Sequence, residues 1–154
     1  MTHPLIGTQA PDFSLPNEAG DVVRLSDFLG QTVVLYFYPK AMTPGCTVQA
    51  CGIRDSIDQF NARGAVVLGI SPDPYPRLQK FIDKYDLSFS LLSDEDHAVA
   101  GAYQCWGMKQ FMGKEYEGLL RTTFIINADG VLTHVMDKVK TKSHHDDVLT
   151  LLAD

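Results

Sequence analysis

The chain has 154 residues, with 13 basic and 19 acidic side chains and a formal net charge of −6. This length suits a single domain spanning residues 1–154, and 45% hydrophobic with 21% charged residues excludes general disorder. The acidic balance argues against a nucleic-acid partner, no apolar run is long enough to cross a bilayer, and residues 1–4 lack signal-peptide features, so we expect a cytoplasmic protein away from membranes.

Hydrophobic periodicity predicts the elements of the first half of the chain. In chain order these are an extended segment at Ile6–Leu15, a short strand at Asp21–Leu25, a capped turn at 26–30, a buried strand at Thr32–Tyr38, a helix with Cys46, Ala50, Ile53, Ile57 and Phe60 on one face that ends at Arg63–Gly64, and a buried strand at Ala65–Ser71.

The same reasoning extends to the second half. The expected elements are a helix opened by Asp73–Pro74, a strand at Ser90–Leu92, a helix capped by Ser93–Asp96, a strand at Arg121–Ile126, a turn at 128–130 with a hairpin partner at Val131–Met136, and a final helix capped by Ser143. This alternation predicts an α/β fold. We expect a thioredoxin-like central mixed β-sheet flanked by helices, with an N-terminal extension and a C-terminal hairpin plus helix.

The segment between the first buried strand and the first helix carries the candidate chemistry. Thr43–Pro44 is typical of a helix N-cap followed by proline in the first turn, which places Cys46 where free N–H groups and the helix dipole favour a thiolate. Ionisation alone gives a modest gain, so fast reaction with an oxidant also needs hydrogen-bond donors for the transition state. Thr43 is close enough in sequence to reach the sulfur or its reaction partner, and a distant arginine is the natural second donor.

Cys51 follows Cys46 by five positions. In an ideal helix their Cα atoms lie about 8.7 Å apart, whereas a disulfide requires roughly 4.4–6.8 Å. A bond between them would therefore require the first turns of the helix to unwind. We expect oxidation to be coupled to local unfolding, eased by Gly45 and Gly52.

Several segments together resemble the peroxiredoxins of the bacterioferritin-comigratory type. The P-x-x-x-T-x-x-C pattern is formed by Pro39, Thr43 and Cys46. The other matching segments are Pro11–Pro16, the block from Phe37 to Gly52, Leu91–Asp94, and Arg121–Ile125 with Gly130.

The resemblance implies a role for each of these site residues. Cys46 would be the peroxidatic cysteine and Cys51 the resolving cysteine of an intramolecular disulfide. Thr43 and Arg121 would hold the peroxide and polarise its O–O bond, and Pro39 would shield the site. The family also implies hydrogen peroxide and organic hydroperoxides as substrates, thioredoxin as reductant, antioxidant defence as the role, no cofactor or metal, and a monomer.

Other interpretations of the same residues compete with this one. A thioredoxin-like disulfide oxidoreductase fits the fold but normally has C-x-x-C, a peroxide sensor would share the chemistry, and a zinc module would need better ligand spacing. Cys105 is expected to be a packed thiol. His144 and His145 are expected to be part of a solvated helix cap, because neighbouring side chains point to different helix faces.

Overall fold

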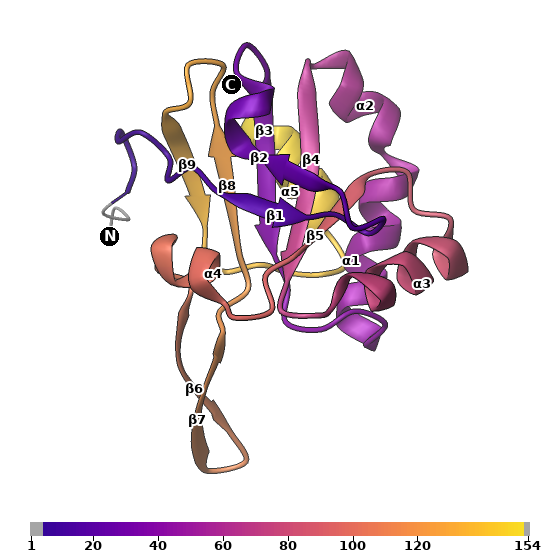
Figure 1. Cartoon of the computed structure of the whole chain (residues 1–154), viewed down its shortest axis with the longest axis vertical. Coiled ribbons are helices and arrows are strands. Elements are labelled where there is room, and N and C mark those ends of the chain that lie inside the picture. Colours follow the sequence, from indigo (N-terminus) through magenta and orange to yellow (C-terminus); the bar gives the residue numbers. More distant parts are fainter. Residues whose placement is uncertain (1–4, 153–154) are drawn as a thin grey trace.

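A five-stranded mixed sheet forms the centre of the molecule (Figure 1). The computed structural model describes residues 5–152. In spatial order the strands are β5 (Ser90–Ser93), β4 (Ala65–Ser71), β3 (Thr32–Phe37), β8 (Thr122–Ile126) and β9 (Leu132–Met136). Strands β3, β4 and β5 are parallel to one another, β8 runs antiparallel to β3, and β9 runs antiparallel to β8. The expected central mixed sheet and its C-terminal hairpin are confirmed.

Strand β3 is buried on both faces, and its alternating side chains divide the core into two layers. Val34 and Tyr36 face one hydrophobic cluster, and Val33 and Leu35 face the other. The helices on the first face are α1 (Pro44–Asp55), α2 (Ile57–Ala62), α3 (Tyr75–Tyr85) and α5 (His144–Leu152). Helix α5 lies behind the sheet in Figure 1 and packs against α1.

The opposite face is covered by shorter elements. These are the paired strands β1 (Ser14–Pro16) and β2 (Val22–Arg24), the 3-10 helix η1 (Leu25–Phe28) and the helix α4 (Ala98–Ala102). Asp94 accepts hydrogen bonds from the backbone N–H groups of Val99 and Ala100 at 3.2 and 2.9 Å, so the expected cap of this helix is confirmed. Of these elements, β1, β2 and η1 form the N-terminal extension that the sequence predicted.

The helix expected to run from Cys46 to Arg63–Gly64 is interrupted. The backbone of Ser56, at φ −109° and ψ 8°, separates α1 from α2. Gly64 follows with φ +67°, a left-handed conformation that glycine adopts without strain and that ends the second helix. The hydrophobic face continues across the break, which explains why periodicity alone predicted one helix.

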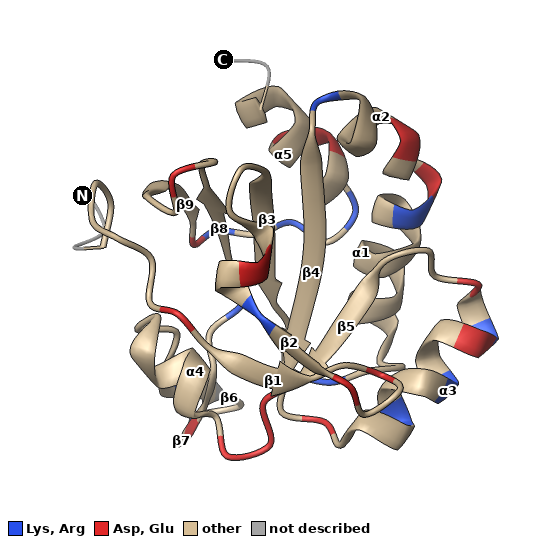
Figure 2. Ribbon diagram, turned by 45° about the horizontal axis from the view of Figure 1, so that its top comes forward, with Lys and Arg blue, Asp and Glu red and all other residues tan. Residues whose placement is uncertain are grey.

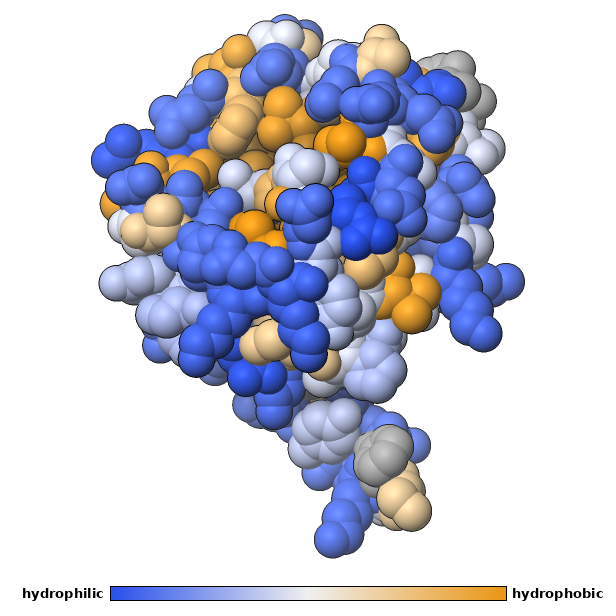
Figure 3. Space-filling model, turned by 90° about the vertical axis from the view of Figure 1, so that its right-hand side faces the viewer, coloured by the Kyte–Doolittle hydropathy of each residue, from blue (hydrophilic) through white to orange (hydrophobic). Residues whose placement is uncertain are grey.

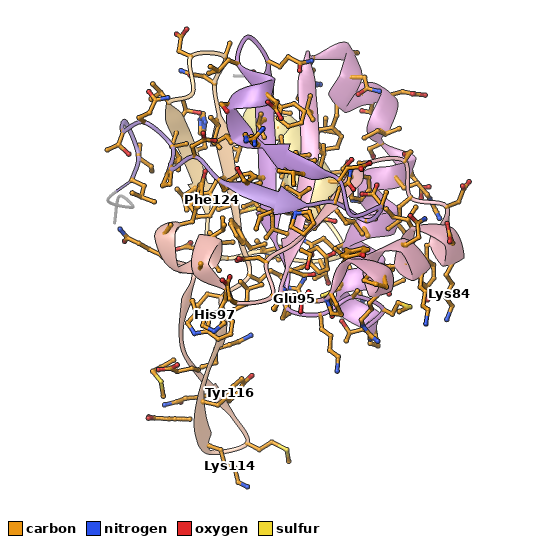
Figure 4. All side chains as sticks on the ribbon, viewed as in Figure 1. Lys84, Glu95, His97, Lys114, Tyr116 and Phe124 are labelled. Carbon is orange, nitrogen blue, oxygen red and sulfur yellow. The ribbon has the colours of Figure 1, made fainter. Side chains whose placement is uncertain are left out.

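A hairpin of β6 (Trp106–Phe111) and β7 (Lys114–Leu119) projects from the body of the molecule (Figures 1 and 3). The hydrophobic pattern of the sequence does not predict this hairpin, because most of its described side chains contact water on both faces and leave no hydrophobic alternation. Its turn uses positive φ at both Met112 and Gly113. At its base the ring of Trp106 stacks on His97 at 3.8 Å between centroids, and Figure 4 shows His97 there with Tyr116 farther along the hairpin.

Charged residues are distributed over helices and loops, and most of the central sheet carries none (Figure 2). The visible face in Figure 3 has small hydrophobic groups between hydrophilic ones. Within residues 5–152, every helix is too short or too polar to span a bilayer.

Gly69 on β4 gives Tyr36 of β3 its space, because a Cβ there would lie 2.8 Å from Leu91 Cδ2 and 2.9 Å from Tyr36 Cζ. We therefore predict that Gly69→Ala lowers the free energy of unfolding by about 1–3 kcal/mol through overpacking. Gly101→Ala in α4 is the matched control, since a Cβ there meets no atom within 4 Å. The control should leave the free energy unchanged or raise it by up to about 1 kcal/mol. Equal effects of the two substitutions in urea unfolding would contradict this packing argument.

Candidate active site

Cys46 lies in the first turn of α1, directly after the loop that leaves the carboxyl end of β3. Its side chain is 1% exposed and its thiol is free. Thr43 is the N-cap and Pro44 the first residue of the helix, as predicted. The sulfur is therefore held at a helix N-terminus, at the sheet edge where α/β proteins place reactive groups.

The loop before α1 is fixed by residues that the sequence analysis did not assign to the site. The Asp73 carboxylate accepts hydrogen bonds from Ala41 N at 2.7 Å and from Ser71 Oγ at 2.9 Å. Arg77 Nη2 donates to the Ala41 carbonyl at 3.0 Å. Met42 has φ +65°, a strained conformation for a side-chain-bearing residue that these contacts hold in place.

The hydroxyl of Thr43 does not cap the helix. It donates instead to the Lys40 carbonyl at 2.8 Å, although the Thr43 backbone has N-cap geometry. A hydroxyl that donates its hydrogen in this way keeps its oxygen lone pairs as acceptors for another group. Pro39 lies half-buried in the same loop.

Arg121 reaches the sulfur from the residue before β8. The antiparallel register pairs Phe37 with Thr122, which brings Arg121 to the end of β3 where α1 begins. Its Nη2 donates to Cys46 Sγ at 3.3 Å, and its Nη1 donates to Gln49 Oε1 at 2.6 Å. The guanidinium therefore places a positive charge directly beside the sulfur. Thus the structure brings Cys46 and Arg121 together, with Gln49 as a partner that sequence reasoning missed.

The expected solvated cap at His144 is wrong. His144 is 0% exposed, with Nδ1 3.2 Å from Gln49 Nε2 and Nε2 2.7 Å from Thr123 Oγ1. Burial is the main reason why the pKa of His144 falls from 6.5 to about 4. The first residue of α5 is therefore a core residue with two polar partners. Only tertiary packing distinguishes it from an exposed cap, and the local sequence carries no such signal.

Cys51 is half-buried and free on the same helix as Cys46. Since α1 is continuous between them, their Cα atoms are about 8.7 Å apart by helix geometry. Gly52 is expected to ease unwinding of the helix. It also has a packing role, because a Cβ at this position would overlap the imidazole of His145. Helix α5 can therefore approach α1 closely beside Cys51.

Lys109 and Cys105 have distinct environments. Lys109 of β6 donates to the Leu119 carbonyl at 2.8 Å, and burial followed by the charge of Arg121 lowers its pKa. Cys105 is buried, its Sγ donates to the Ala100 carbonyl at 3.4 Å, and burial raises its pKa to about 12. Cys105 therefore has the environment of a packed thiol. Across the described part of the chain, no cluster of three or more His, Cys, Asp or Glu side chains could hold a metal ion.

Comparison with known proteins agrees with this geometry. Residues 6–135 match the AhpC/TSA family. "Peroxiredoxin Bcp" of Escherichia coli K12 is 55% identical over 148 residues, covering 96% of this chain and 95% of that protein. The Bacillus subtilis 168 protein of the same name is 46% identical over 149 residues, covering 97% and 95%.

Solved structures give the same result. A Xanthomonas campestris bacterioferritin comigratory protein, described for its alkyl peroxide reduction activity, matches with a TM-score of 0.87 and 33% identity over 92% of this chain and 90% of that one. Peroxidoxin BcpB from Mycobacterium tuberculosis matches with a TM-score of 0.86 and 37% identity over 98% and 97%.

A thioredoxin-like fold with a buried helix-start cysteine beside an arginine defines a thiol peroxidase. The chain belongs to the AhpC/TSA family of peroxiredoxins. The expected family, fold class and peroxidase activity are thereby confirmed.

The buried His144 predicts an acid-dependent loss of stability. Because its pKa is about 4 in the folded protein and 6.5 ordinarily, the unfolded chain binds an extra proton between these values. The contribution is fully present above pH 6.5 and is lost as the pH falls toward 4, by about 3 kcal/mol in total. We expect urea unfolding from pH 7 to pH 4 to show this loss, and His144→Gln to remove it. Substituting His134 on β9 in the same way controls for the general loss of a histidine. An unchanged pH slope in His144→Gln would contradict the assignment.

Proposed function

We propose that Cys46 is the peroxidatic cysteine of this enzyme. The observation that carries the proposal is the buried Sγ at the start of α1 with Arg121 Nη2 3.3 Å away. The thiolate attacks the terminal oxygen of a hydroperoxide, so an S–O bond forms as the O–O bond breaks. Cys46 becomes a sulfenic acid, and the leaving alkoxide or hydroxide takes up a proton as alcohol or water. Hydrogen peroxide and organic hydroperoxides are the substrate classes.

Three residues assist this step in our proposal. Arg121 stabilises the negative charge that shifts onto the leaving oxygen. The Thr43 hydroxyl donates to Lys40, so its oxygen accepts the O–H of the hydroperoxide and orients the peroxide toward the sulfur. Pro39 forms part of the half-buried loop that limits the access of water.

Cys51 is the proposed resolving cysteine. Its sulfur attacks the sulfenic sulfur of Cys46, and a disulfide forms with loss of one water molecule. Since intact helix geometry keeps the two Cα atoms about 8.7 Å apart, the first turns of α1 must unwind beforehand. A dithiol reductant of the thioredoxin class then returns both cysteines to thiols by disulfide exchange.

We further propose that the chain acts as one domain, as a monomer and in the cytoplasm, in antioxidant defence. Both hydrophobic clusters share strand β3, which supports a single folding unit. The two cysteines lie on one helix, so the disulfide needs no second subunit.

Mass spectrometry after one equivalent of hydrogen peroxide tests the two cysteine roles. We expect the parent protein to lose two hydrogens, Cys51→Ser to gain one oxygen at Cys46, and Cys46→Ser to remain unchanged and without peroxidase activity. Cys105→Ser is the matched control and should behave like the parent, because Cys105 is buried in the hydrophobic cluster on the opposite face of the sheet from Cys46. Peroxide consumption by Cys46→Ser would overturn the proposal.

The proposed role of Thr43 predicts a rate effect without a large loss of stability. Thr43→Val removes the hydroxyl while keeping the side-chain shape, and the helix does not lose a side-chain cap because none is present. We expect the second-order rate of Cys46 oxidation to fall about 100-fold, as for other preorganised polar groups. Thr43→Ser keeps the hydroxyl and should stay within a few-fold of the parent in stopped-flow measurements. If valine and serine gave the same rate, the hydroxyl would have no role in orienting the peroxide.

A further inference from the structure

A continuous set of hydrogen bonds connects the reactive sulfur to the buried histidine of α5. Arg121 donates to Cys46 Sγ and to Gln49 Oε1, and Gln49 Nε2 lies 3.2 Å from His144 Nδ1. The opposite ring nitrogen of His144 lies 2.7 Å from Thr123 Oγ1. Gln49 and His144 are both 0% exposed, so water does not compete for these contacts.

The direction of each hydrogen bond follows from the arginine. Arg121 has only donors, so the oxygen of the Gln49 amide faces it and the NH₂ group faces His144. Nδ1 of His144 must then accept, and the ring is neutral with its proton on Nε2, donated to Thr123 Oγ1. A second proton on Nδ1 would face the Gln49 NH₂ group and break the link.

The groups around His144 agree with a neutral ring. The ring of Tyr36 from β3 packs at 5.6 Å between centroids. Burial is the largest cause of the lowered pKa of His144; Arg121 and His145 act in the same direction and Asp147 opposes them. The link to Gln49 is therefore intact throughout the neutral pH range.

Gln49 also lies between the two cysteines on α1. When residues 46–51 unwind to join Cys46 to Cys51, Gln49 leaves its position, and its contacts with Arg121 and His144 break. The contact that aligns Arg121 in the folded site thus opposes the unwinding that the disulfide requires.

We propose that His144 is a positioning residue with two effects: through Gln49 it aligns Arg121 on Cys46, and it restrains the helix turn that must open before Cys51 can react. This inference rests on the proposed roles of the two cysteines. A tighter restraint leaves the Cys46 sulfenic acid exposed for longer to a second hydroperoxide. That peroxide adds one oxygen to give a sulfinic acid and leaves as alcohol or water.

Two amide substitutions distinguish the contact at Nδ1 of His144 from the contact at Nε2. His144→Asn places an amide oxygen near the Nδ1 position and can still accept from Gln49, whereas His144→Gln reaches toward Thr123 and leaves Gln49 without its acceptor. For His144→Gln we expect Cys46 oxidation to be about tenfold slower, the size of one net hydrogen bond. The sulfinic fraction at a given peroxide dose should fall by a similar factor. His144→Asn should stay within about threefold of the parent in both measurements.

The measurements are stopped-flow oxidation of the reduced full-length protein and mass spectrometry of Cys46 after graded hydrogen peroxide. A purely structural role of His144 would affect the two variants alike and would not lower both oxidation and sulfinic yield in His144→Gln alone. Equal behaviour of the two variants, or slower oxidation without a lower sulfinic fraction, overturns the inference. If the parent forms neither sulfenic acid nor disulfide at Cys46, the proposed function itself fails.

Gln49→Glu provides an independent test if His144→Gln does not fold. The carboxylate still accepts from Arg121, and it also accepts from His144 once the ring carries its proton on Nδ1, with Thr123 Oγ1 then donating to Nε2. Because a hydrogen bond to a carboxylate is stronger than one to an amide, the restraint on the helix turn tightens. We expect the sulfinic fraction of Gln49→Glu at a given peroxide dose to exceed that of the parent at neutral pH. An unchanged or lower sulfinic fraction overturns the restraint.

Discussion

The hydrogen bond from Arg121 to the sulfur of Cys46 is the contact on which the rest of the site depends. Seventy-five positions separate the two residues, and they meet because β3 leads into α1 while β8 runs antiparallel beside β3. Within the described ranges, Arg121 forms no ion pair with a carboxylate; its acceptors are Gln49 and Cys46. Since the half-buried guanidinium has no carboxylate partner there, its positive charge is directed at the sulfur of Cys46. In the proposed mechanism, this is the sulfur that attacks the peroxide.

Local patterns in the sequence were sufficient for the central sheet, for most of the helices that flank it and for the candidate reactive cysteine. The apolar run of β3, the Thr43–Pro44 start of α1 and the position of Cys46 are all encoded within a few neighbouring residues. Gln49 and His144 could not be found in this way, because their role arises only when α1, α5 and β8 pack together. Similarly, the hairpin of β6 and β7 has exposed side chains on both faces and so lacks the periodicity by which strands are recognised.

His144 and His145 show how adjacent residues can have different roles on one helix. They are separated by about 100° around the axis of α5, so one ring enters the core and the other lies on the surface of α1. The close approach depends on Gly52, which has no Cβ to meet His145. From the sequence alone, the run of two histidines and two aspartates after Ser143 is indistinguishable from a hydrated helix start. The packing of α5 on α1 decides between the two, and it does so through a glycine on the other helix.

In the proposed mechanism, the same helix must satisfy two opposing requirements. Attack on a peroxide requires an intact first turn, because the helix N-terminus and Arg121 act on the sulfur only in that geometry. Resolution requires that turn to open, and each hydrogen bond that holds it contributes about 0.5–1.5 kcal/mol. Two or three such contacts correspond to an open population of roughly 0.1–10%, the range in which a minor state is both rare and readily reached. With weaker contacts Arg121 would be misaligned. With stronger contacts the sulfenic acid would react with a second peroxide before Cys51 could form the disulfide. The link from Gln49 through His144 to Thr123 is made of neutral side chains rather than a buried ion pair, which gives the restraint on the turn this intermediate strength.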